Sequence, residues 1–199
     1  MSEQQQQSTE RLVPIGVSAR HIHLSKDHLE QLFGAGYALK PLKPLSQPGQ
    51  FAAEETVELE GPKGSFGKVR ILGPTRGRTQ IEVSRTDAFT LGIDPPVRES
   101  GSIDGTPGLI VKGPKGRIEL EEGVIVAARH IHFHTSEAEA WGIRDKDRLH
   151  VRLQGERPLI FTDVLARVSP QYGLDLHIDT DEANAAGVKT GDRAVIVQG

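Results

Sequence analysis

Short runs of alternating or β-branched residues, separated by glycine and proline, fill the middle of the chain. Each run is four to six residues long, and period-two alternation over such a length is typical of a β-strand. Glycine and proline recur between the runs from position 41 to position 116. Many short strands joined by turns are typical of barrels and sandwiches. The predicted strands cover residues 56–59, 68–72, 79–84, 109–112 and 123–127.

The pattern predicts few helices, and each of them is short. Ser25 can cap a helix whose apolar stripe consists of Leu29, Leu32 and Phe33. Ser136 and Glu139 form a capping-box pattern that places a second helix ahead of Trp141. The expected fold is therefore mainly β, with a small number of short α-helices.

Two segments of the chain echo each other. Residues 17–23 recur with six of the same seven residue types at 126–132, a displacement of 109 positions. A second echo consists of an acidic residue, Ala, three further residues, Gly, and then Ile or Val. We interpret each copy as a short helix that ends at its glycine, and the copies lie at residues 87–93, 137–143 and 182–188. The echoes predict two small β-barrels related by internal duplication.

The composition is that of a globular chain. It has 199 residues, of which 36% are apolar and 26% are charged, and its formal net charge is −3. Because 24 basic residues face 27 acidic ones, we do not expect a nucleic-acid partner bound through a broad cationic face. The absence of cysteine excludes disulfides, thiolate ligands and cysteine nucleophiles. Any metal must therefore be held by His, Asp or Glu.

The beginning of the chain gives no sign of export. Residues 1–11 are polar and rich in Gln, without the apolar stretch of about 7 to 15 residues that a secretory signal needs. No window of the sequence approaches the roughly 18 consecutive apolar residues of a membrane span. We therefore expect a cytoplasmic protein that does not associate with a membrane.

Histidine gathers in two pairs, His21 with His23 and His130 with His132. In a strand, side chains two positions apart point to the same face with Cα atoms roughly 6.5 Å apart, so both imidazoles of a pair can reach one ion. The alternative is a pair of polar residues on a solvated strand face. Two pairs in matching sequence contexts favour metal binding.

Two imidazoles are too few for a tight site, since zinc usually takes three or four protein ligands. Strand alternation offers two further candidates. Glu82 lies on the polar face of predicted strand 79–84, and His177 lies on the polar face of residues 174–179, where a neighbouring carboxylate could fix its tautomer. Judged alone, each of these residues could equally be an exposed polar side chain.

A tight basic turn at residues 73–78 leads into the strand that carries Glu82. Arg76, Arg78 and Glu82 are an even number of positions apart, so in an extended strand their side chains would point to the same face. Guanidinium groups bind phosphate through paired hydrogen bonds, so this turn predicts a phosphate site beside a metal. The alternative is an Arg-Gly-Arg turn that is merely exposed to solvent.

Through these residues, the chain resembles the PduL-type phosphate propanoyltransferases, also called phosphotransacylases. The likeness extends from residue 12 to residue 197 and rests on segments 20–23, 73–84, 98–101, 129–132 and 175–179. It implies two helix-capped β-barrels, one built from residues 12–20 and 129–199 and the other from residues 21–128. It also implies an acyltransferase that exchanges a short acyl group, such as propanoyl, between coenzyme A and inorganic phosphate.

The resemblance further implies a two-metal site, normally occupied by zinc, in which phosphate attacks the thioester directly. The ligands implied for the first metal are His21, His23 and Glu82. Those implied for the second metal are His130, His132 and His177. Arg76 would be the catalytic and phosphate-binding residue, helped by Ser100. Coenzyme A would lie along Val17, Ser18 and Ala19, with Lys63, Arg70 and Asn184 nearby.

The resemblance also implies a homodimer whose small-molecule partners are acyl-CoA and phosphate. Family members housed in bacterial microcompartments, as in propanediol utilization, often begin with an amphipathic segment. Residues 1–11 show no such apolar stripe, which leaves encapsulation and contact with microcompartment proteins open. Two alternatives use the same ligands: a metal-dependent acyl-CoA hydrolase, and a non-catalytic metal-binding barrel within an assembly. Arg76 distinguishes the hydrolase, because hydrolysis does not need a phosphate site.

Overall fold

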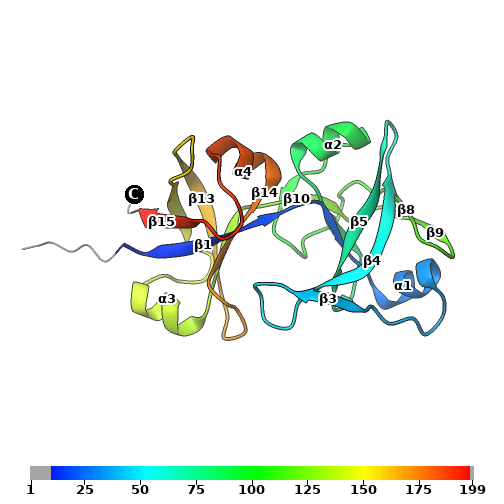
Figure 1. Cartoon of the computed structure of the whole chain (residues 1–199), viewed down its shortest axis with the longest axis horizontal. Coiled ribbons are helices and arrows are strands. Elements are labelled where there is room, and N and C mark those ends of the chain that lie inside the picture. Colours follow the sequence, from blue (N-terminus) through cyan, green and yellow to red (C-terminus); the bar gives the residue numbers. More distant parts are fainter. Residues whose placement is uncertain (1–9, 198–199) are drawn as a thin grey trace, which may run out of the picture.

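Two β-sheets lie beside each other along the long axis of the molecule, with short helices packed at their edges (Figure 1). This computed structural model describes residues 10–197, so most of the segment 1–11 lies outside the described residues. The first sheet is a closed barrel, and the second is a curled half-barrel. The mainly β class with short helices, predicted from the sequence, is thereby confirmed.

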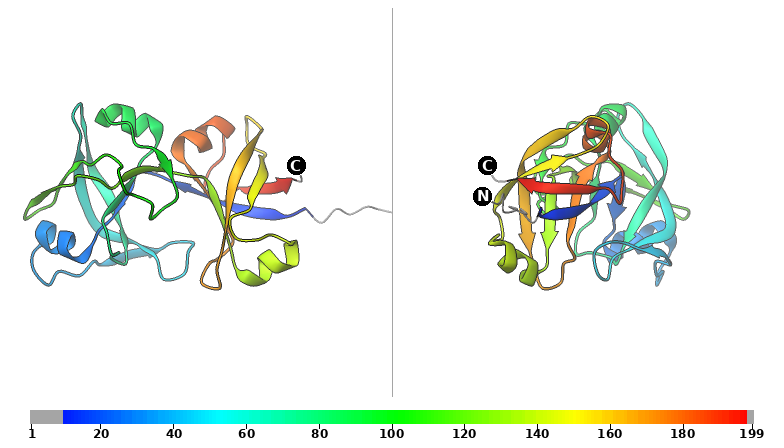
Figure 2. Two further views of the ribbon diagram at one scale, coloured as in Figure 1. Left: turned by 180° about the vertical axis from the view of Figure 1, so that it is seen from behind. Right: turned by 60° about the vertical axis from the view of Figure 1, so that its left-hand side comes forward.

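The closed barrel consists of six strands whose alternate residues point into a common core. Val13, Ile15, Ile131 and Leu176 are completely or almost completely buried there. Seen from the side in Figure 2, the first and last strands of this barrel run next to each other. In their order around the barrel, the strands are β1 (Leu12–Ser18), β14 (Asp175–Asp179), β11 (His130–Phe133), β13 (Leu159–Val168), β12 (Arg148–Leu153) and β15 (Arg193–Val197).

The second sheet has nine strands and a separate core that includes Ile22, Ile71 and Ile81. The strand β3 (Pro41–Pro44) pairs only with β4, at the side of the main path. Along that path the strands are β7 (Val97–Arg98), β10 (Val124–Ala127), β6 (Gln80–Glu82), β2 (His21–His23), β5 (Ser65–Gly73), β4 (Phe51–Glu60), β8 (Ile110–Lys112) and β9 (Arg117–Glu119).

The chain passes between the two sheets at two matching places. It leaves the closed barrel after β1 and enters the second sheet at His21, and it returns from β10 to the barrel at His130. An Ala-Arg pair precedes the histidine at each crossing. The two histidine pairs of the sequence are therefore brought to the junction of the sheets by the topology itself.

Four helices of seven or eight residues lie within the described part of the chain. They are α1 (Lys26–Phe33), α2 (Arg85–Leu91), α3 (Thr135–Trp141) and α4 (Thr180–Ala186). Ser25 caps α1 as the sequence predicts. The last three helices end at Gly92, Gly142 and Gly187, each in the left-handed conformation that favours glycine.

The predicted capping box of α3 is wrong. The helix is capped by His134, whose Nδ1 accepts a hydrogen bond from the Ser136 amide at 3.2 Å, and Glu137 completes the box. The predicted strand 79–84 is also shorter than expected and ends at Glu82. It stops there because Ser84 caps α2, with its hydroxyl accepting from the Asp87 amide at 3.2 Å.

The two crossings also share the way in which side chains hold a helix to them. Arg20 Nε donates to Asp87 Oδ1 at 2.9 Å, and Asp87 belongs to the capping box of α2. Arg129 Nη1 donates to Glu182 Oε1 at 2.9 Å, and Glu182 belongs to the capping box of α4. Each arginine directly precedes a histidine pair and binds the first turn of a helix. This contact fixes the position of the pair.

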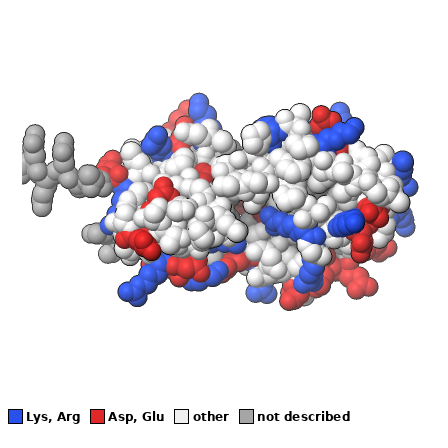
Figure 3. Space-filling model, turned by 90° about the horizontal axis from the view of Figure 1, so that it is seen from below, with Lys and Arg blue, Asp and Glu red and all other residues white. Residues whose placement is uncertain are grey.

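Acidic and basic side chains are interspersed over the face of the molecule shown in Figure 3. Over residues 10–197, none of the helices has the length and apolar character that a membrane crossing requires.

Candidate active site

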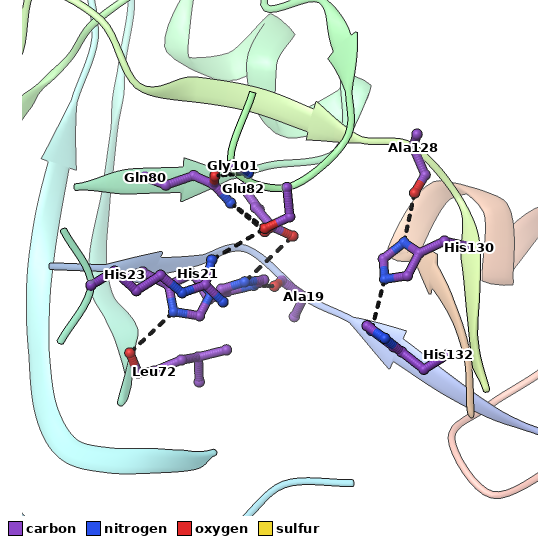
Figure 4. A network of polar contacts seen from close by, with 12 residues as sticks. Ala19, His21, His23, Leu72, Gln80, Glu82, Gly101, Ala128, His130 and His132 are labelled. Atoms are coloured by element: carbon purple, nitrogen blue, oxygen red, sulfur yellow. Dashed lines mark hydrogen bonds and ion pairs between the residues drawn. The ribbon is translucent and has the colours of Figure 1, made fainter. Parts of the chain in front are cut away.

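The first ligand cluster is formed by β2 and β6. His21 lies directly opposite Glu82 in the antiparallel pair, and His23 shares the face of His21 because it is two residues further along the strand. Ile22, between them, is completely buried in the core. His21 Nε2 lies 3.5 Å from Glu82 Oε2 (Figure 4). The ligand atoms of the three residues all lie within 4.8 Å of one another.

Backbone carbonyls fix which nitrogen of these two imidazoles carries the proton. His21 Nδ1 donates to the Ala19 carbonyl at 2.9 Å, and His23 Nδ1 donates to the Leu72 carbonyl at 3.2 Å. A carbonyl can only accept, so in each neutral ring the lone pair is on Nε2. Two nitrogen lone pairs and the Glu82 carboxylate therefore converge without a proton between them, which is the donor set of a cation site.

The second cluster repeats this arrangement in the closed barrel. His130 lies opposite His177 in the pairing of β11 with β14, and His132 shares its face. His130 Nδ1 donates to the Ala128 carbonyl at 2.8 Å, and its Nε2 lies 3.1 Å from His132 Nε2. His132 Nδ1 is buried and has no hydrogen-bond partner. The two Nε2 atoms face each other, and the ligand atoms of His130, His132 and His177 all lie within 4.8 Å of one another, which fits a metal site.

His177 has the neighbouring carboxylate that the sequence suggested. Its Nε2 lies 2.9 Å from Asp175 Oδ2, two residues earlier on the same face of β14. Asp175 is buried, and the Cβ that an alanine would add at Gly16 would approach its Oδ2 to 2.8 Å. The small residue in β1 therefore leaves room for this pair.

Burial keeps three of the imidazoles neutral. It lowers the pKa of His23 to about 3, with help from the charges of His21 and Arg76. Burial likewise lowers the pKa of His130 to about 4 and that of His132 to about 2, in both cases with a further contribution from His177. Neutral imidazole is the form that binds metal, so these rings are ready ligands at neutral pH.

Glu82 is ionised at neutral pH. Burial alone would raise the pKa of its carboxyl, but electrostatic interactions with the neighbouring imidazoles and with the Arg76 guanidinium outweigh it and lower the pKa to about 2. Five imidazoles and one carboxylate then form two groups of three ligands. This donor set, without thiolates, suits zinc and the neighbouring divalent transition metals.

Arg76 is held beside the first cluster. Its backbone amide donates to the Leu24 carbonyl at 2.9 Å, and its Nη1 donates to Ser100 Oγ at 3.2 Å. Ser100 Oγ in turn donates to Glu82 Oε1 at 3.1 Å. Burial and the nearby charge of Arg167 lower the pKa of the Arg76 guanidinium. The predicted phosphate-binding pair, Arg76 and Ser100, therefore lies next to a ligand of the first cluster.

Arg78, which shares parity with Arg76, points away from the site. Its side chain is half exposed and forms ion pairs with Asp104 and Glu122 at the surface. Parity alone could not separate the two arginines, because the turn between β5 and β6 does not keep a regular alternation.

Gln80 is a site residue that the sequence reasoning did not single out. It is buried, and its Nε2 donates to Glu82 Oε1 at 2.6 Å and to Ser100 Oγ at 2.8 Å. Its Oε1 accepts from the Gly101 amide at 2.7 Å (Figure 4). The available signal was its position on the same strand face as Glu82. Gln80 fixes the carboxylate and the hydroxyl relative to each other.

A pocket joins the two clusters. Its lining consists of Ser18, Ala19, Glu82, Val83, Ala127, Ala128, His130, His177, Ile178 and Asp179. Of the residues predicted to contact coenzyme A, only Ser18 and Ala19 belong to this lining. Val17 precedes them on β1, and its amide donates to Thr190 Oγ1 at 3.1 Å.

The other three predicted contacts for coenzyme A lie outside this lining. Lys63 packs against Gly92 at the end of α2. Arg70 donates to the carbonyls of Ala53 and Glu54, both at 2.8 Å. Asn184 is exposed on α4.

Comparison with known proteins decides the family. The sequence model of the phosphate propanoyltransferase family matches residues 14–189. The chain belongs to this family. A phosphate propanoyltransferase of Thermotoga maritima is 56% identical over 185 residues, which are 92% of this chain and 88% of the relative. Another, from Alkaliphilus metalliredigens, is 49% identical over 96% of this chain and 91% of its own length.

A third member of the phosphate propanoyltransferase family, from Priestia megaterium, is 52% identical over 184 residues, 92% of this chain and 85% of the relative. All three alignments span most of both chains, so both sheets and the junction between them fall within the family likeness. The family resemblance drawn from the doubled Arg-His-Ile-His segment is thereby confirmed.

Proposed function

We propose that this chain transfers a short acyl group, such as propanoyl, between coenzyme A and inorganic phosphate. One observation carries the proposal. Two ligand clusters of matching geometry face a shared pocket, and the Arg76 guanidinium is tied through Ser100 to Glu82 of the first cluster. Membership of the phosphate propanoyltransferase family supports the same reaction.

We infer two metal ions, which the imidazole-rich donor set suggests are zinc. The first would be held by His21, His23 and Glu82, and the second by His130, His132 and His177. When bound, such ions supply positive charge that polarises the thioester carbonyl and stabilises a departing thiolate.

The side chains around the clusters bind and orient the phosphate. Arg76 binds two phosphate oxygens, and Ser100, whose Oγ accepts from Arg76 Nη1 and donates to Glu82, holds that guanidinium in place. A direct contact of Ser100 with phosphate stays a prediction. A further phosphate oxygen then attacks the acyl carbon directly. A bond from that oxygen to the carbon forms, the carbon–sulfur bond breaks, and the sulfur leaves with the electron pair as the thiolate of coenzyme A. No covalent acyl-enzyme is needed, in keeping with a sequence that has no cysteine.

Coenzyme A is proposed to reach the clusters along β1. Ser18 and Ala19 line the pocket and lie directly before His21, so a thioester in the pocket is close to both clusters. Contacts of coenzyme A with Val17, Lys63, Arg70 and Asn184 stay predictions. The homodimer, the cytoplasmic location and any association with microcompartment proteins stay predictions as well.

Release of coenzyme A from propanoyl-CoA, followed with a thiol reagent with and without phosphate, tests the proposed reaction. We expect release to require phosphate and to yield one propanoyl phosphate for each thiol, which hydroxylamine traps as the hydroxamate. Equal release without phosphate would identify a metal-dependent hydrolase instead. Protein that contains metal but turns over no acyl-CoA in either condition would support the non-catalytic barrel.

A further inference from the structure

A second guanidinium, that of Arg167, lies beside the second ligand cluster. Arg167 is on β13 directly opposite His132 of β11, and residues opposite each other in neighbouring strands share a face. Its neighbour Ala166 lies opposite Ile131, and both are buried in the barrel core. Arg167 is therefore directed to the same side of the barrel as the histidine ligands.

Tyr172 holds this guanidinium in place. Arg167 Nη2 donates to Tyr172 Oη at 3.2 Å, and the guanidinium carbon lies 5.6 Å from the centre of the tyrosine ring. The same ring packs edge-on against His132, with 4.4 Å between ring centres. Arg167, Tyr172 and His132 thus form one contiguous group at the junction of the sheets.

Arg167 and Arg76 approach the site from different sheets. Within residues 10–197, neither of them forms an ion pair with a carboxylate. Burial lowers the pKa of the Arg76 guanidinium, the charge of Glu82 opposes this, and the charge of Arg167 lowers the pKa further. The charge of Arg167 also helps to lower the pKa of Glu99, but that carboxylate already accepts a hydrogen bond from Lys146. Two partly buried guanidinium groups that lack a directly paired carboxylate favour a bound anion between them.

The loop that carries Tyr172 is tied to the other sheet. Gln47 is buried, its Nε2 donates to the Gly173 carbonyl at 2.9 Å, and its Oε1 accepts from the Gly173 amide at 3.2 Å. Pro48, which follows Gln47 in the chain, lines a pocket together with Gly49, Gln50, Gly73, Pro74 and Arg76. Gln47 therefore links the Tyr172 loop of the closed barrel to the loop that borders the Arg76 pocket.

We propose that Arg167 is a second phosphate-contacting residue, which with Arg76 binds the transferred phosphate between the two sheets, and that Tyr172 is its positioning residue. This assignment rests on the proposed acyl transfer. Two guanidinium groups together offer enough donors to bind a phosphate dianion while leaving one oxygen for attack on the acyl carbon. Arg167 touches the phosphate, whereas Tyr172 acts through Arg167.

Steady-state kinetics of Arg167→Gln in both directions tests the assignment. We expect KM for phosphate, and KM for acyl phosphate in the reverse direction, to rise roughly 10- to 100-fold, because a hydrogen bond to a charged group is lost. KM for acyl-CoA and KM for coenzyme A are expected to stay within about twofold, since their contacts lie elsewhere. Arg167→Lys keeps the charge but loses the planar fork, so its KM for phosphate should lie between those of wild type and Arg167→Gln.

Two variants serve as controls. Arg193→Gln removes an exposed arginine of β15 in the same barrel and should change no KM. Tyr172→Phe keeps the ring against His132 but removes the oxygen that Arg167 contacts, so it should raise KM for phosphate a few-fold and leave metal content unchanged. The phosphate-induced rise in melting temperature gives a readout that does not depend on turnover. It should shrink in Arg167→Gln and persist in Arg193→Gln.

Some outcomes would overturn the assignment. An Arg167→Gln protein with wild-type metal content and an unchanged KM for phosphate would exclude Arg167 from the phosphate site. A rise confined to KM for acyl-CoA would instead assign the guanidinium to a phosphate of coenzyme A. If Arg167→Gln does not fold, Arg167→Lys decides the question. A folded Arg167→Lys protein with wild-type phosphate affinity would show that the guanidinium fork of Arg167 does not bind phosphate. A wild-type chain without phosphate-dependent transfer would refute the proposed function, and the melting-temperature shift would still test Arg167.

Discussion

Replacement of His130 by alanine is expected to reduce acyl transfer by about 1,000-fold or more. His130 is the central imidazole of the second cluster: its Nε2 lies 3.1 Å from His132 Nε2, and it lies opposite His177. Loss of one of three ligands would release the proposed metal, and a bound metal contributes several kcal/mol of charge stabilisation to such a transition state. Initial rates at saturating propanoyl-CoA and phosphate measure the effect.

His150→Ala is the matched control for His130→Ala. His150 is a partly buried histidine of β12 in the same barrel and belongs to neither ligand cluster. Its substitution should leave the rate within about twofold of wild type, because the side chain lies in neither ligand cluster. A His130→Ala enzyme that is folded and nearly as active as wild type would show that the second cluster is not needed for the reaction.

Arg76→Ala is expected to produce the second largest effect, a loss of several kcal/mol of transition-state stabilisation. The guanidinium is partly buried beside Ser100 and Glu82, where water does not replace it well. KM for phosphate should rise steeply and kcat should fall, whereas KM for propanoyl-CoA should change little. Rates measured over a wide range of phosphate concentrations separate the two parameters.

Arg78→Ala tests whether the effect belongs to the turn or to the site. Arg78 lies two residues away in the same turn, but it pairs with Asp104 and Glu122 at the surface. Exposed ion pairs contribute about 0–1 kcal/mol, so this variant should keep near-normal kinetics. If Arg76→Ala also kept near-normal kinetics, Arg76 would not belong to the phosphate site.

Much of the local structure follows from residue alternation. The runs that predicted strands 56–59, 68–72 and 123–127 lie within or largely within β4, β5 and β10, because each places branched residues towards a core. The strand β3 was not expected, since proline is disfavoured inside a sheet, and it lies off the main path of its sheet.

The pairing of strands could not be predicted from local patterns. The strand β1 pairs in parallel with β14, and Ile15 faces Leu176 although the two are far apart in the sequence. Such a register depends on long-range packing rather than on the residues of either strand. Local spacing therefore identified each histidine pair, but the register placed Glu82 and His177 opposite them.

The residues missed by the sequence reasoning lack a motif of their own. Gln80 shared a predicted strand face with Glu82 and could have been found by alternation. Arg167 and Tyr172 stand in segments without histidine or glycine-rich signals, and their proximity to His132 depends on the pairing of β13 with β11 and on a loop fold. The cap of α3 by His134 was missed because a histidine is an uncommon N-cap residue.

Elemental analysis of the purified protein tests whether the two ligand clusters bind metal. We expect about two divalent ions per chain in wild type and about one in each of His21→Ala and His130→Ala, since each substitution disables one cluster of three ligands. The double variant should bind close to none. A folded wild-type protein that binds no divalent metal, or metal content that neither substitution lowers, would show that these clusters are not metal sites.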